Sequence, residues 1–257
     1  MKVSDVLAEK GIPRADLEVL LAHVLQKDRG FLAAHPEFSL SAEQEKKIRE
    51  WMARRKNHEP TAYIVGKQEF YGRTFKVDPR VLIPRPATEG LVDLALQFLK
   101  NGKNDTREID SNIIAVAKAF GDVSDVETIV DVGTGSGCIA ITLALERPDL
   151  HIIATDISED ALAVARENAA LHRAADRIRF LQGKDLEPIA DLREPFVIVS
   201  NPPYMPKGRS LEAEVMHEPH QALFDARMPQ RLLEHAQKIP HCRGIIVECE
   251  AIYIFPS

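Results

Sequence analysis

Hydrophobic residues follow two different periods along this chain. Up to about residue 57 they recur at intervals of three and four residues, in two separate runs. The residues with this helical spacing are Leu17, Leu20, Leu21, Val24 and Leu25 in the first run and Ile48, Trp51 and Met52 in the second. Pro13 suits the first turn of the first helix, and the SAEQ segment from Ser41 resembles a capping box that begins the second. The pattern predicts a small helical domain over residues 1–57.

From Glu127 onward, short continuous apolar runs alternate with longer stretches of helical spacing. The runs predict strands at 127–131, 151–156, 177–181, 195–200 and 244–249, and the stretches predict helices near 137–146, 159–173 and 228–238. Such alternation is typical of βαβ units, so we expect an α/β domain with a parallel, Rossmann-like sheet. Ligands of these sheets bind beside the carboxyl ends of the strands.

The region between these two parts changes character twice. Residues 58–86 carry short β-like runs, YIVG, EFYG and RTFKV, which predict a β-hairpin linker. Pro84 and Pro86 disfavour a helix until after Pro86, and helical spacing resumes over residues 88–100. Residues 101–126 begin with a polar stretch, and we expect an insert there with one helix near 112–120. The α/β domain, including this insert, covers 87–257.

A glycine-rich turn follows the first predicted strand of the α/β domain. It comprises Asp131, Val132, Gly133, Thr134, Gly135, Ser136 and Gly137. Glycine lets a ligand approach the backbone closely, and Asp156, at the end of the next strand, is placed to bind ribose hydroxyls. A nicotinamide dinucleotide and S-adenosylmethionine both suit such a turn. The GxGxxG spacing of dinucleotide sites is absent, and Asp131 suits the charged amino-acid end of S-adenosylmethionine, so we predict the latter.

A second polar segment, Asn201-Pro202-Pro203-Tyr204, follows the apolar run FVIVS. Asn201 can offer its side-chain oxygen and Pro202 its carbonyl to a planar NH2 group. Tyr204 supplies a flat face for stacking. This combination indicates an enzyme that acts on an amide or an exocyclic amine.

Asp185 and Leu186 follow the third predicted strand at the same edge of the sheet. Asp185 is a candidate to receive an adenine amino group, with Leu186 beside the ring. A loop or helix-capping role explains the same aspartate equally well.

Composition narrows the class of protein. The 257 residues are 45% hydrophobic and 28% charged, as in ordinary soluble globular proteins, and no run reaches membrane-spanning length. We expect a cytoplasmic protein because the N-terminus has no signal-peptide pattern. Three cysteines without CxxC spacing and nine histidines without a paired-ligand pattern predict no metal site. A net charge of -6 disfavours stable nucleic-acid binding.

Several collinear segments together resemble the HemK/PrmC family, the N5-glutamine methyltransferases of peptide chain release factors. They are WMARRKNHEPTAYIVGKQEFYGRTFKV, LIPRPATEGLV, DVGTGSGCIAITLA, ATDIS, IVSNPPY and EPHQALFDA. The resemblance implies a class I S-adenosylmethionine-dependent methyltransferase domain and an N-terminal helical domain that recognises the release factor. It also implies that residues Gly133–Gly137 and Asp156 bind cofactor and that Asn201–Tyr204 hold the glutamine of the GGQ motif.

The chain departs from the family pattern in three places. Lys184 stands where an acid is usual, with Asp185 one position later, and the 101–126 insert is longer than expected. The family's last helix and final two strands have no counterpart after the strand at 244–249. We therefore expect that strand to form an unpaired sheet edge, with low stability or dimerisation and weak turnover.

Two alternatives remain open at the level of sequence. One is a DNA or RNA amine methyltransferase that uses the same NPPY site, which the acidic net charge disfavours. The other is a shortened chain that binds cofactor or release factor with little turnover.

Overall fold

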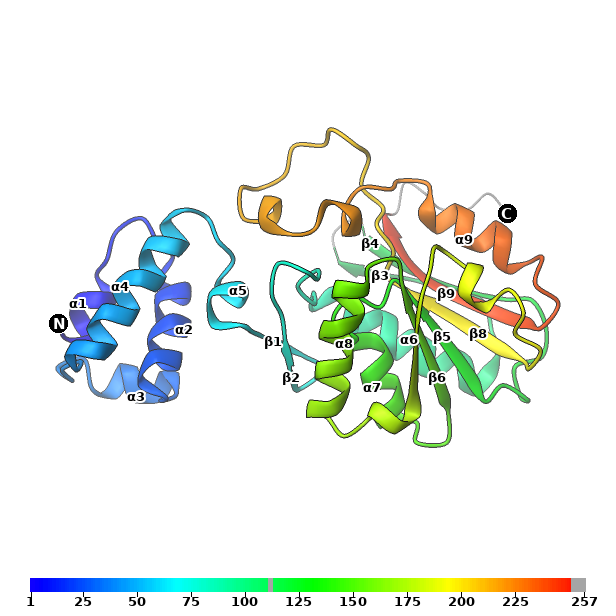
Figure 1. The fold of residues 1–257 in the computed structure, drawn as a ribbon, viewed down its shortest axis with the longest axis horizontal. Helices are drawn as coiled ribbons and strands as arrows, with labels where there is room; N and C mark the ends of the chain where they lie inside the picture. Colours follow the sequence, from blue (N-terminus) through cyan, green and yellow to red (C-terminus); the bar gives the residue numbers. More distant parts are fainter. Residues whose placement is uncertain (111–112, 251–257) are drawn as a thin grey trace. The chain divides into compact units, whose positions relative to one another are not determined.

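The computed structural model describes residues 1–110 and 113–250. The chain divides into two compact units. The helical unit comprises Met1–Lys67 together with Leu211–His217, and the α/β unit comprises Gln68–Ser210 together with the chain from Glu218 onward. Figure 1 colours both units by sequence position. In the part of the chain described, no helix is both long and apolar enough to cross a membrane.

The helical unit contains five helices. They are α1 (Val3–Leu7), α2 (Arg14–Leu25), α3 (Arg29–Ala34), α4 (Ala42–Lys56) and α5 (Thr61–Val65). The predicted capping box of α4 is confirmed, because the Gln44 amide N–H donates to Ser41 Oγ at 3.2 Å and the Ser41 N–H donates to Gln44 Oε1 at 2.9 Å. The apolar stripe of α2 is buried in this unit's core, as its spacing predicts.

The segment Leu211–His217 belongs to the helical unit although it lies far along the sequence. Its contacts centre on Arg55 of α4, which bonds Asp16 at 2.7 Å and Glu214 at 2.6 Å. His217 Nε2 lies 3.2 Å from the Asn57 carbonyl oxygen. These contacts attach the segment that follows the NPPY motif to the end of α4.

The linker region is part helix and part hairpin. Strands β1 (Lys67–Phe70) and β2 (Arg73–Lys76) form a two-stranded sheet, which confirms the hairpin. The β-like interpretation of YIVG is wrong, because Tyr63 and Ile64 lie within α5. Pro60 precedes this helix at its N-cap and Gly66 ends it with φ 74°, so both boundaries are set by residues suited to helix termini.

A seven-stranded sheet forms the centre of the α/β unit. Its strands are β3 (Asp105–Asp110), β4 (Ile113–Ala119), β5 (Thr128–Val132), β6 (His151–Asp156), β7 (Ile178–Gln182), β8 (Phe196–Ser200) and β9 (Cys242–Glu250). Their order is β3-β4-β9-β8-β5-β6-β7, and β9, β8, β5, β6 and β7 are mutually parallel. All five predicted strands are confirmed, each within two residues of its predicted bounds at either end.

Helices cover both faces of this sheet (Figure 1). They are α6 (Ala87–Asn101), α7 (Cys138–Glu146), α8 (Glu159–Leu171) and α9 (Met228–Ala236). Short 3-10 turns of this unit lie at Ala175–Arg177, Glu187–Ile189 and His220–Ala222, and another, Val215–His217, lies in the segment that belongs to the helical unit. Alternate residues of β8 enter different cores, with Val197 and Val199 on the α6 and α7 side and Ile198 on the α9 side.

The insert differs from its prediction. Residues 113–119, expected to be helical, form strand β4, which pairs antiparallel with β9 from Ile113 opposite Glu250 to Ala119 opposite Gly244. Strand β3 pairs antiparallel with β4 on the far side. The expected unpaired edge at 244–249 is therefore wrong, because β9 lies between β4 and β8. The two insert strands, β4 and β3, thus lie on the side of β9 that was expected to be unpaired. Residues 251–257 lie outside the described part of the chain.

Candidate active site

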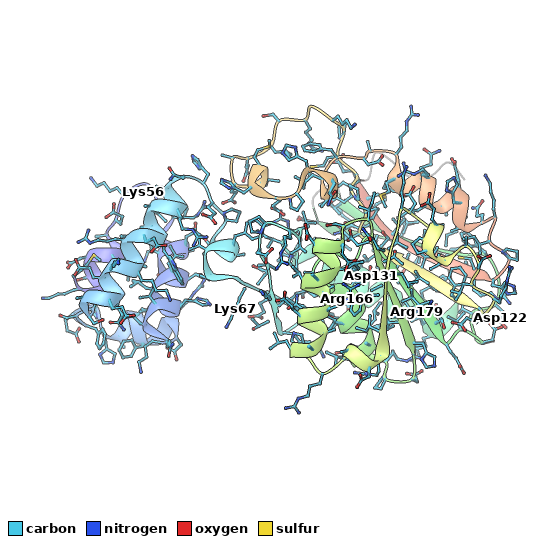
Figure 2. The ribbon with its side chains drawn as sticks, viewed as in Figure 1. Lys56, Lys67, Asp122, Asp131, Arg166 and Arg179 are labelled. Carbon is cyan, nitrogen blue, oxygen red and sulfur yellow. The ribbon has the colours of Figure 1, made fainter. Side chains whose placement is uncertain are left out.

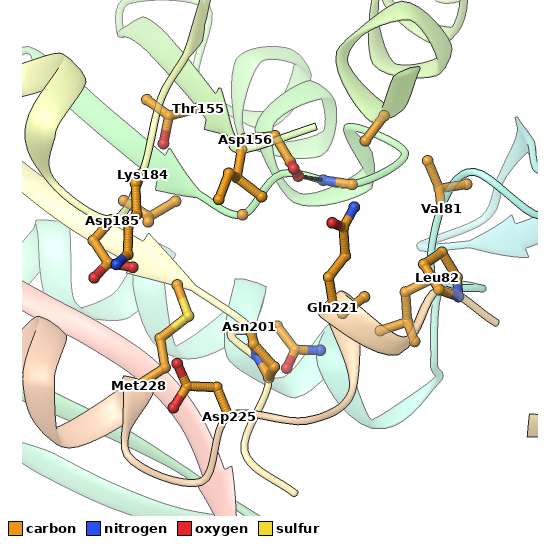
Figure 3. Close-up of a pocket in the computed structure, with 18 of the residues that line it drawn as sticks. Val81, Leu82, Thr155, Asp156, Lys184, Asp185, Asn201, Gln221, Asp225 and Met228 are labelled. Atoms are coloured by element: carbon orange, nitrogen blue, oxygen red, sulfur yellow. Dashed lines mark hydrogen bonds between the residues drawn. The ribbon is translucent and has the colours of Figure 1, made fainter. Parts of the chain in front are cut away.

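A cavity of about 280 Å³ opens at the carboxyl ends of β5, β6 and β8. It is lined by Gly133 and Gly135 of the glycine turn, by Asp156, and by Asn201 and Pro203 of the NPPY motif. Figure 3 shows Asp156 and Asn201 on different sides of this cavity, with Gln221, Asp225 and Met228 between or below them. The structure thus brings the two predicted motifs to one cavity.

The glycine turn has backbone conformations that explain its composition. Gly133, Gly135 and Gly137 have φ values of 74°, 54° and 81°. Apart from each glycine and its two chain neighbours, no atom lies within 4 Å of where a Cβ would project from Gly133 or Gly135, so these two leave open space beside the cavity. At Gly137 a Cβ would lie 3.1 Å from the Ala165 Cβ. Gly137 therefore permits close packing of the turn on α8.

Asp131, labelled in Figure 2, is fully buried in the α/β unit and does not line the cavity. Its Oδ2 accepts hydrogen bonds from Thr134 Oγ1 at 2.6 Å and from the Ala140 N–H at 3.1 Å. Among the described residues, neither Asp131 Oδ1 nor Ser136 Oγ has a hydrogen-bond partner. Burial raises the pKa of the Asp131 carboxyl to about 7. In this arrangement Asp131 ties the turn to the first turn of α7.

Asp156 faces the cavity from the end of β6. Its Oδ2 accepts from the Gly135 N–H at 2.9 Å and its Oδ1 from the Ser158 N–H at 2.9 Å. Figure 3 shows the bond to the turn. Burial raises the pKa of Asp156 despite these two bonds. Each carboxylate oxygen can accept a further hydrogen bond, which suits a diol at this edge.

Asp185 lines the cavity beside Lys184, while Leu186 packs into the core on the α9 side. Asp185 has φ 50° and accepts from Arg231 of α9, at 2.7 Å from Nε and 3.2 Å from Nη2. Arg231 also donates to Asp225 at 2.9 Å. The sequence gives no sign of this arginine, because α9 begins more than forty residues after Asp185 in the chain.

The NPPY segment is anchored by residues that the sequence analysis did not identify. Asn201 Nδ2 donates to Thr88 Oγ1 at 3.0 Å, and Thr88 Oγ1 donates to Glu248 Oε2 at 2.9 Å. Tyr204 Oη donates to Glu248 Oε1 at 3.2 Å. Glu248, on β9, is 1% exposed, and burial raises its pKa to about 7. Burial also raises the pKa of Tyr204, so its hydroxyl stays a donor.

Sequence comparison decides the family. Residues 1–66 match the PrmC N-terminal domain and residues 100–225 match the methyltransferase small domain. The release factor glutamine methyltransferase of Chlorobaculum tepidum is 42% identical over 224 residues, covering 84% of this chain and 70% of that protein. That of Koribacter versatilis is 40% identical over 220 residues, with the same two coverages. The chain belongs to the release factor glutamine methyltransferase family. Its α/β unit has the class I S-adenosylmethionine-dependent methyltransferase fold.

Longer relatives also exist. A bifunctional methyltransferase of Rickettsia bellii is 37% identical over 252 residues, which are 91% of this chain and 44% of that protein. The chain therefore spans less than half of that relative. Among solved structures, the catalytic domain of hMettl16 is similar to this chain, with 13% sequence identity and a TM-score of 0.49. The similar region covers 81% of this chain and 69% of the hMettl16 chain.

Two further family segments meet at the cavity. Leu82 of the LIPRP segment and Val81, directly before it, line the cavity. Gln221 of the EPHQAL segment lines it as well (Figure 3). Glu218, which is 3% exposed, joins them by accepting from the Ile83 N–H at 3.1 Å and from Arg85. Two segments that are far apart in the sequence thus form one wall of the site. Among the described residues, no cluster of three or more histidine, cysteine or acidic side chains could hold a metal.

Proposed function

We propose that this chain transfers a methyl group from S-adenosylmethionine to the side-chain amide nitrogen of the GGQ glutamine in a peptide chain release factor. One observation carries the proposal: a single cavity is lined both by the glycine turn with Asp156 and by Asn201 with Pro203. The printed names of the relatives support the choice of a release factor glutamine as the methyl acceptor. Such a substrate implies a cytoplasmic protein.

The residues around the glycine turn fit the cofactor. Gly133 and Gly135 leave space beside their backbone, and Asp156 offers carboxylate oxygens where a ribose would lie. Lys184 and Asp185 line the adjoining wall, where the adenine would be placed. When bound, S-adenosylmethionine supplies an electrophilic methyl group on a positively charged sulfur. Asp131, Thr134 and Ser136 support the turn from behind rather than facing the cavity.

The NPPY residues would hold the substrate amide. An amide nitrogen is a poor nucleophile because its lone pair is delocalised into the carbonyl. Asn201 Oδ1 and the Pro202 carbonyl would each accept one N–H of the glutamine amide, which increases electron density on its nitrogen. Alignment of two bound reactants contributes about 7–11 kcal/mol in favourable cases. The proton leaves to solvent after transfer, so this scheme requires no general base before it.

Tyr204 has a supporting place in this scheme. Its ring was expected to stack on the amide plane, yet Tyr204 is absent from the cavity lining and its hydroxyl donates to buried Glu248. Pro203, which does line the cavity, offers an apolar surface next to Asn201 in the chain. We therefore assign Tyr204 to holding the NPPY backbone in place.

The helical unit is the proposed docking element for the release factor. Residues 1–66 match the PrmC N-terminal domain, and the predicted cofactor and substrate residues all lie outside this range. A large protein substrate needs contacts beyond the one glutamine that enters the cavity. This assignment predicts that a chain without residues 1–57 binds cofactor but methylates intact release factor poorly.

The experiment that tests the function is methyl transfer from labelled S-adenosylmethionine to purified release factor, followed by mass-spectrometric location of the methyl group. We expect one methyl group on the GGQ glutamine and none on release factor with asparagine there. Asn201→Ala should abolish transfer and leave cofactor affinity nearly unchanged. Label on DNA or RNA instead of release factor would identify a nucleic-acid amine methyltransferase and refute the proposal.

A further inference from the structure

A chain of buried hydrogen bonds runs from the sheet to the proposed substrate amide. It begins at Glu248 on β9, passes through Thr88 in the first turn of α6, and ends at Asn201. The two distances are 2.9 Å and 3.0 Å. Thr88 and Glu248 are each 1% exposed, and only Asn201 reaches the cavity. The arrangement therefore joins a buried carboxyl to the group that would bind substrate.

The chemistry of these three groups determines which group donates and which accepts in each hydrogen bond. An ionised carboxylate only accepts hydrogen bonds, so the single hydroxyl proton of Thr88 is donated to Glu248. The Thr88 oxygen can then only accept from Asn201. Of the two ends of the Asn201 amide, only the NH2 end is a donor, so that end faces Thr88 and Oδ1 is left for the cavity. The opposite flip would aim an NH2 group at the substrate NH2.

We propose that Thr88 and Glu248 are positioning residues that hold the Asn201 amide in the orientation that accepts from the substrate glutamine. This inference rests on the proposed function, because it assigns the acceptor at the same site. Protonated Glu248 can donate to Thr88, which frees the Thr88 hydroxyl to donate to Asn201 Oδ1. The ionised form of Glu248 is therefore the form that supports methyl transfer.

The surroundings of Glu248 show what controls its charge. Burial is the largest influence and raises its pKa, while hydrogen bonds from Thr88, Tyr204 and Asn201 and the charge of Arg85 favour the ionised form. Strand β4 places apolar Ala115 opposite Glu248, and the neighbouring strand β8 reads FVIVS, without charged residues. Helix α9 packs against the Ile245 and Val247 side of β9, which is the other face. Among the described residues, Arg85 is thus the cation that acts on this carboxyl.

The ionisation of Glu248 predicts how methyl transfer depends on pH. The folded-state pKa of Glu248 is about 7, so the carboxyl is protonated below that pH and ionised above it. Methyl transfer should rise with pH through about 7 and then level off. Buried Asp131 has a similar pKa, so the pH profile alone does not identify the group. Substitution at Thr88 separates them, because Thr88 contacts Glu248 and lies outside the Asp131 hydrogen bonds.

The test compares Thr88→Val with Thr88→Ser. Valine keeps the volume and removes the hydroxyl, whereas serine keeps the hydroxyl. We expect Thr88→Val to lower kcat on the order of 10²-fold, as for removal of one preorganised polar partner. We expect its cofactor affinity to stay within about twofold of wild type, since Thr88 is outside the cavity lining. Its pH step near 7 should be smaller, because only the direct contact of Asn201 with Glu248 remains, and Thr88→Ser should restore both kcat and the step.

A binding measurement separates positioning from folding. Calorimetric titration with a GGQ peptide in the presence of S-adenosylhomocysteine should show weaker peptide binding for Thr88→Val than for Thr88→Ser. Equal kcat in the two variants, whether both high or both low, would overturn the inference. A pH profile of methyl transfer by the wild type that is flat around pH 7 would also overturn it. That measurement does not depend on whether a variant folds. If wild type does not methylate the release factor glutamine, the proposed function fails instead.

Discussion

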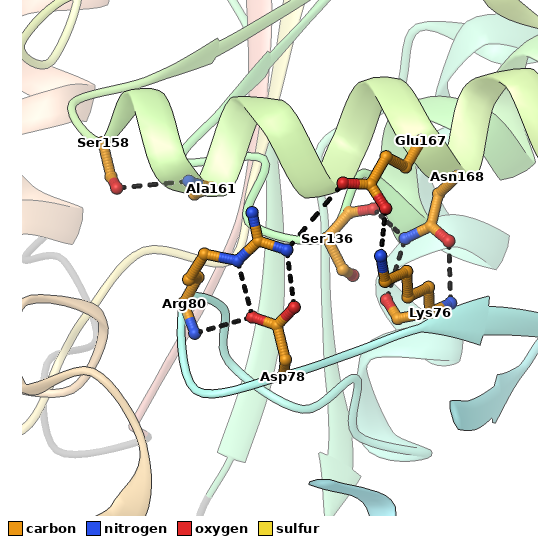
Figure 4. A network of polar contacts seen from close by, with 8 residues as sticks. All are labelled: Lys76, Asp78, Arg80, Ser136, Ser158, Ala161, Glu167 and Asn168. Carbon is orange, nitrogen blue, oxygen red and sulfur yellow. Dashed lines mark hydrogen bonds and ion pairs between the residues drawn. The ribbon is translucent and has the colours of Figure 1, made fainter. Parts of the chain in front are cut away.

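Asn168 makes the most informative test of how the glycine turn is held. This residue of α8 is 0% exposed, and it connects three segments of the α/β unit (Figure 4). Its Nδ2 donates to the Lys76 carbonyl at 2.9 Å and to the Ser136 carbonyl at 2.8 Å. Its Oδ1 accepts from the Lys76 N–H at 2.7 Å. The Asn168 amide therefore connects α8 both to hairpin strand β2 and to the glycine turn.

The magnitude follows from these three bonds. A buried hydrogen bond contributes about 0.5–1.5 kcal/mol net, and an unsatisfied buried partner costs about 1–3 kcal/mol. Asn168→Ala removes all three bonds and leaves backbone groups of Lys76 and Ser136 unpaired. We expect the free energy of unfolding to fall by about 3–5 kcal/mol. Cofactor affinity should also fall, because the Ser136 carbonyl lies within the turn that borders the cavity.

The control is Lys76→Ala, which keeps the Lys76 backbone bonds and removes only its ion pair with Glu167. Both side chains are nearly half exposed, at 47% and 45%, so the loss should be at most about 1 kcal/mol. The single tryptophan, Trp51, lies in the helical unit, and its fluorescence would report on the wrong unit. Urea unfolding should therefore be followed by circular dichroism, with thermal shifts in S-adenosylhomocysteine. Equal losses in the two variants would refute the reasoning.

Three further changes test other parts of the structure. Asp156→Ala should weaken cofactor binding by about 1.5–3 kcal/mol, the value of a charged hydrogen bond, in a calorimetric titration; unchanged affinity would remove Asp156 from the site. The raised pKa of Asp131 means that stability falls as pH rises from about 4 to about 7, so Asp131→Asn should make urea midpoints less dependent on pH in that window; an unaltered slope would show that Asp131 is not responsible. Gly244→Ala should lower stability by about 1–3 kcal/mol, because its Cβ would lie 2.6 Å from Phe98 Cζ and 2.8 Å from the Lys118 carbonyl oxygen; an unchanged melting temperature would contradict this packing.

The fold was largely predictable where local sequence decides it. Strand β8 is buried on both faces and so begins with a continuous apolar run, FVIV. The α4 terminus has a capping box whose residues are three apart. Strand β4 was missed because IIAVAKA suits a helix as well as a strand, and pairing with β9, more than 120 residues away, decides its state. YIV was misassigned because Ile64 and Val65 pack against the helical core, which favours α5.

The site residues likewise differ in whether the local sequence reveals them. The glycine turn and NPPY were visible because contiguous residues carry their geometry, through positive φ values and fixed proline backbone. Thr88 and Glu248 were not visible, because they are separated by 160 residues and meet only in the folded sheet. The Arg231 contact with Asp185 spans 46 residues and is likewise a product of the fold.

The place of β9 in the sheet has a consequence for the order in which the protein can fold during synthesis. Strands β4 and β8, its neighbours, both precede it in the chain. Until the ribosome has released Cys242–Glu250, each of them has an open hydrogen-bonding edge in what will be the middle of the sheet. Open edges favour pairing with other chains. Substitutions that delay the entry of β9 should therefore reduce the yield of folded protein more than the stability of the molecules that do fold.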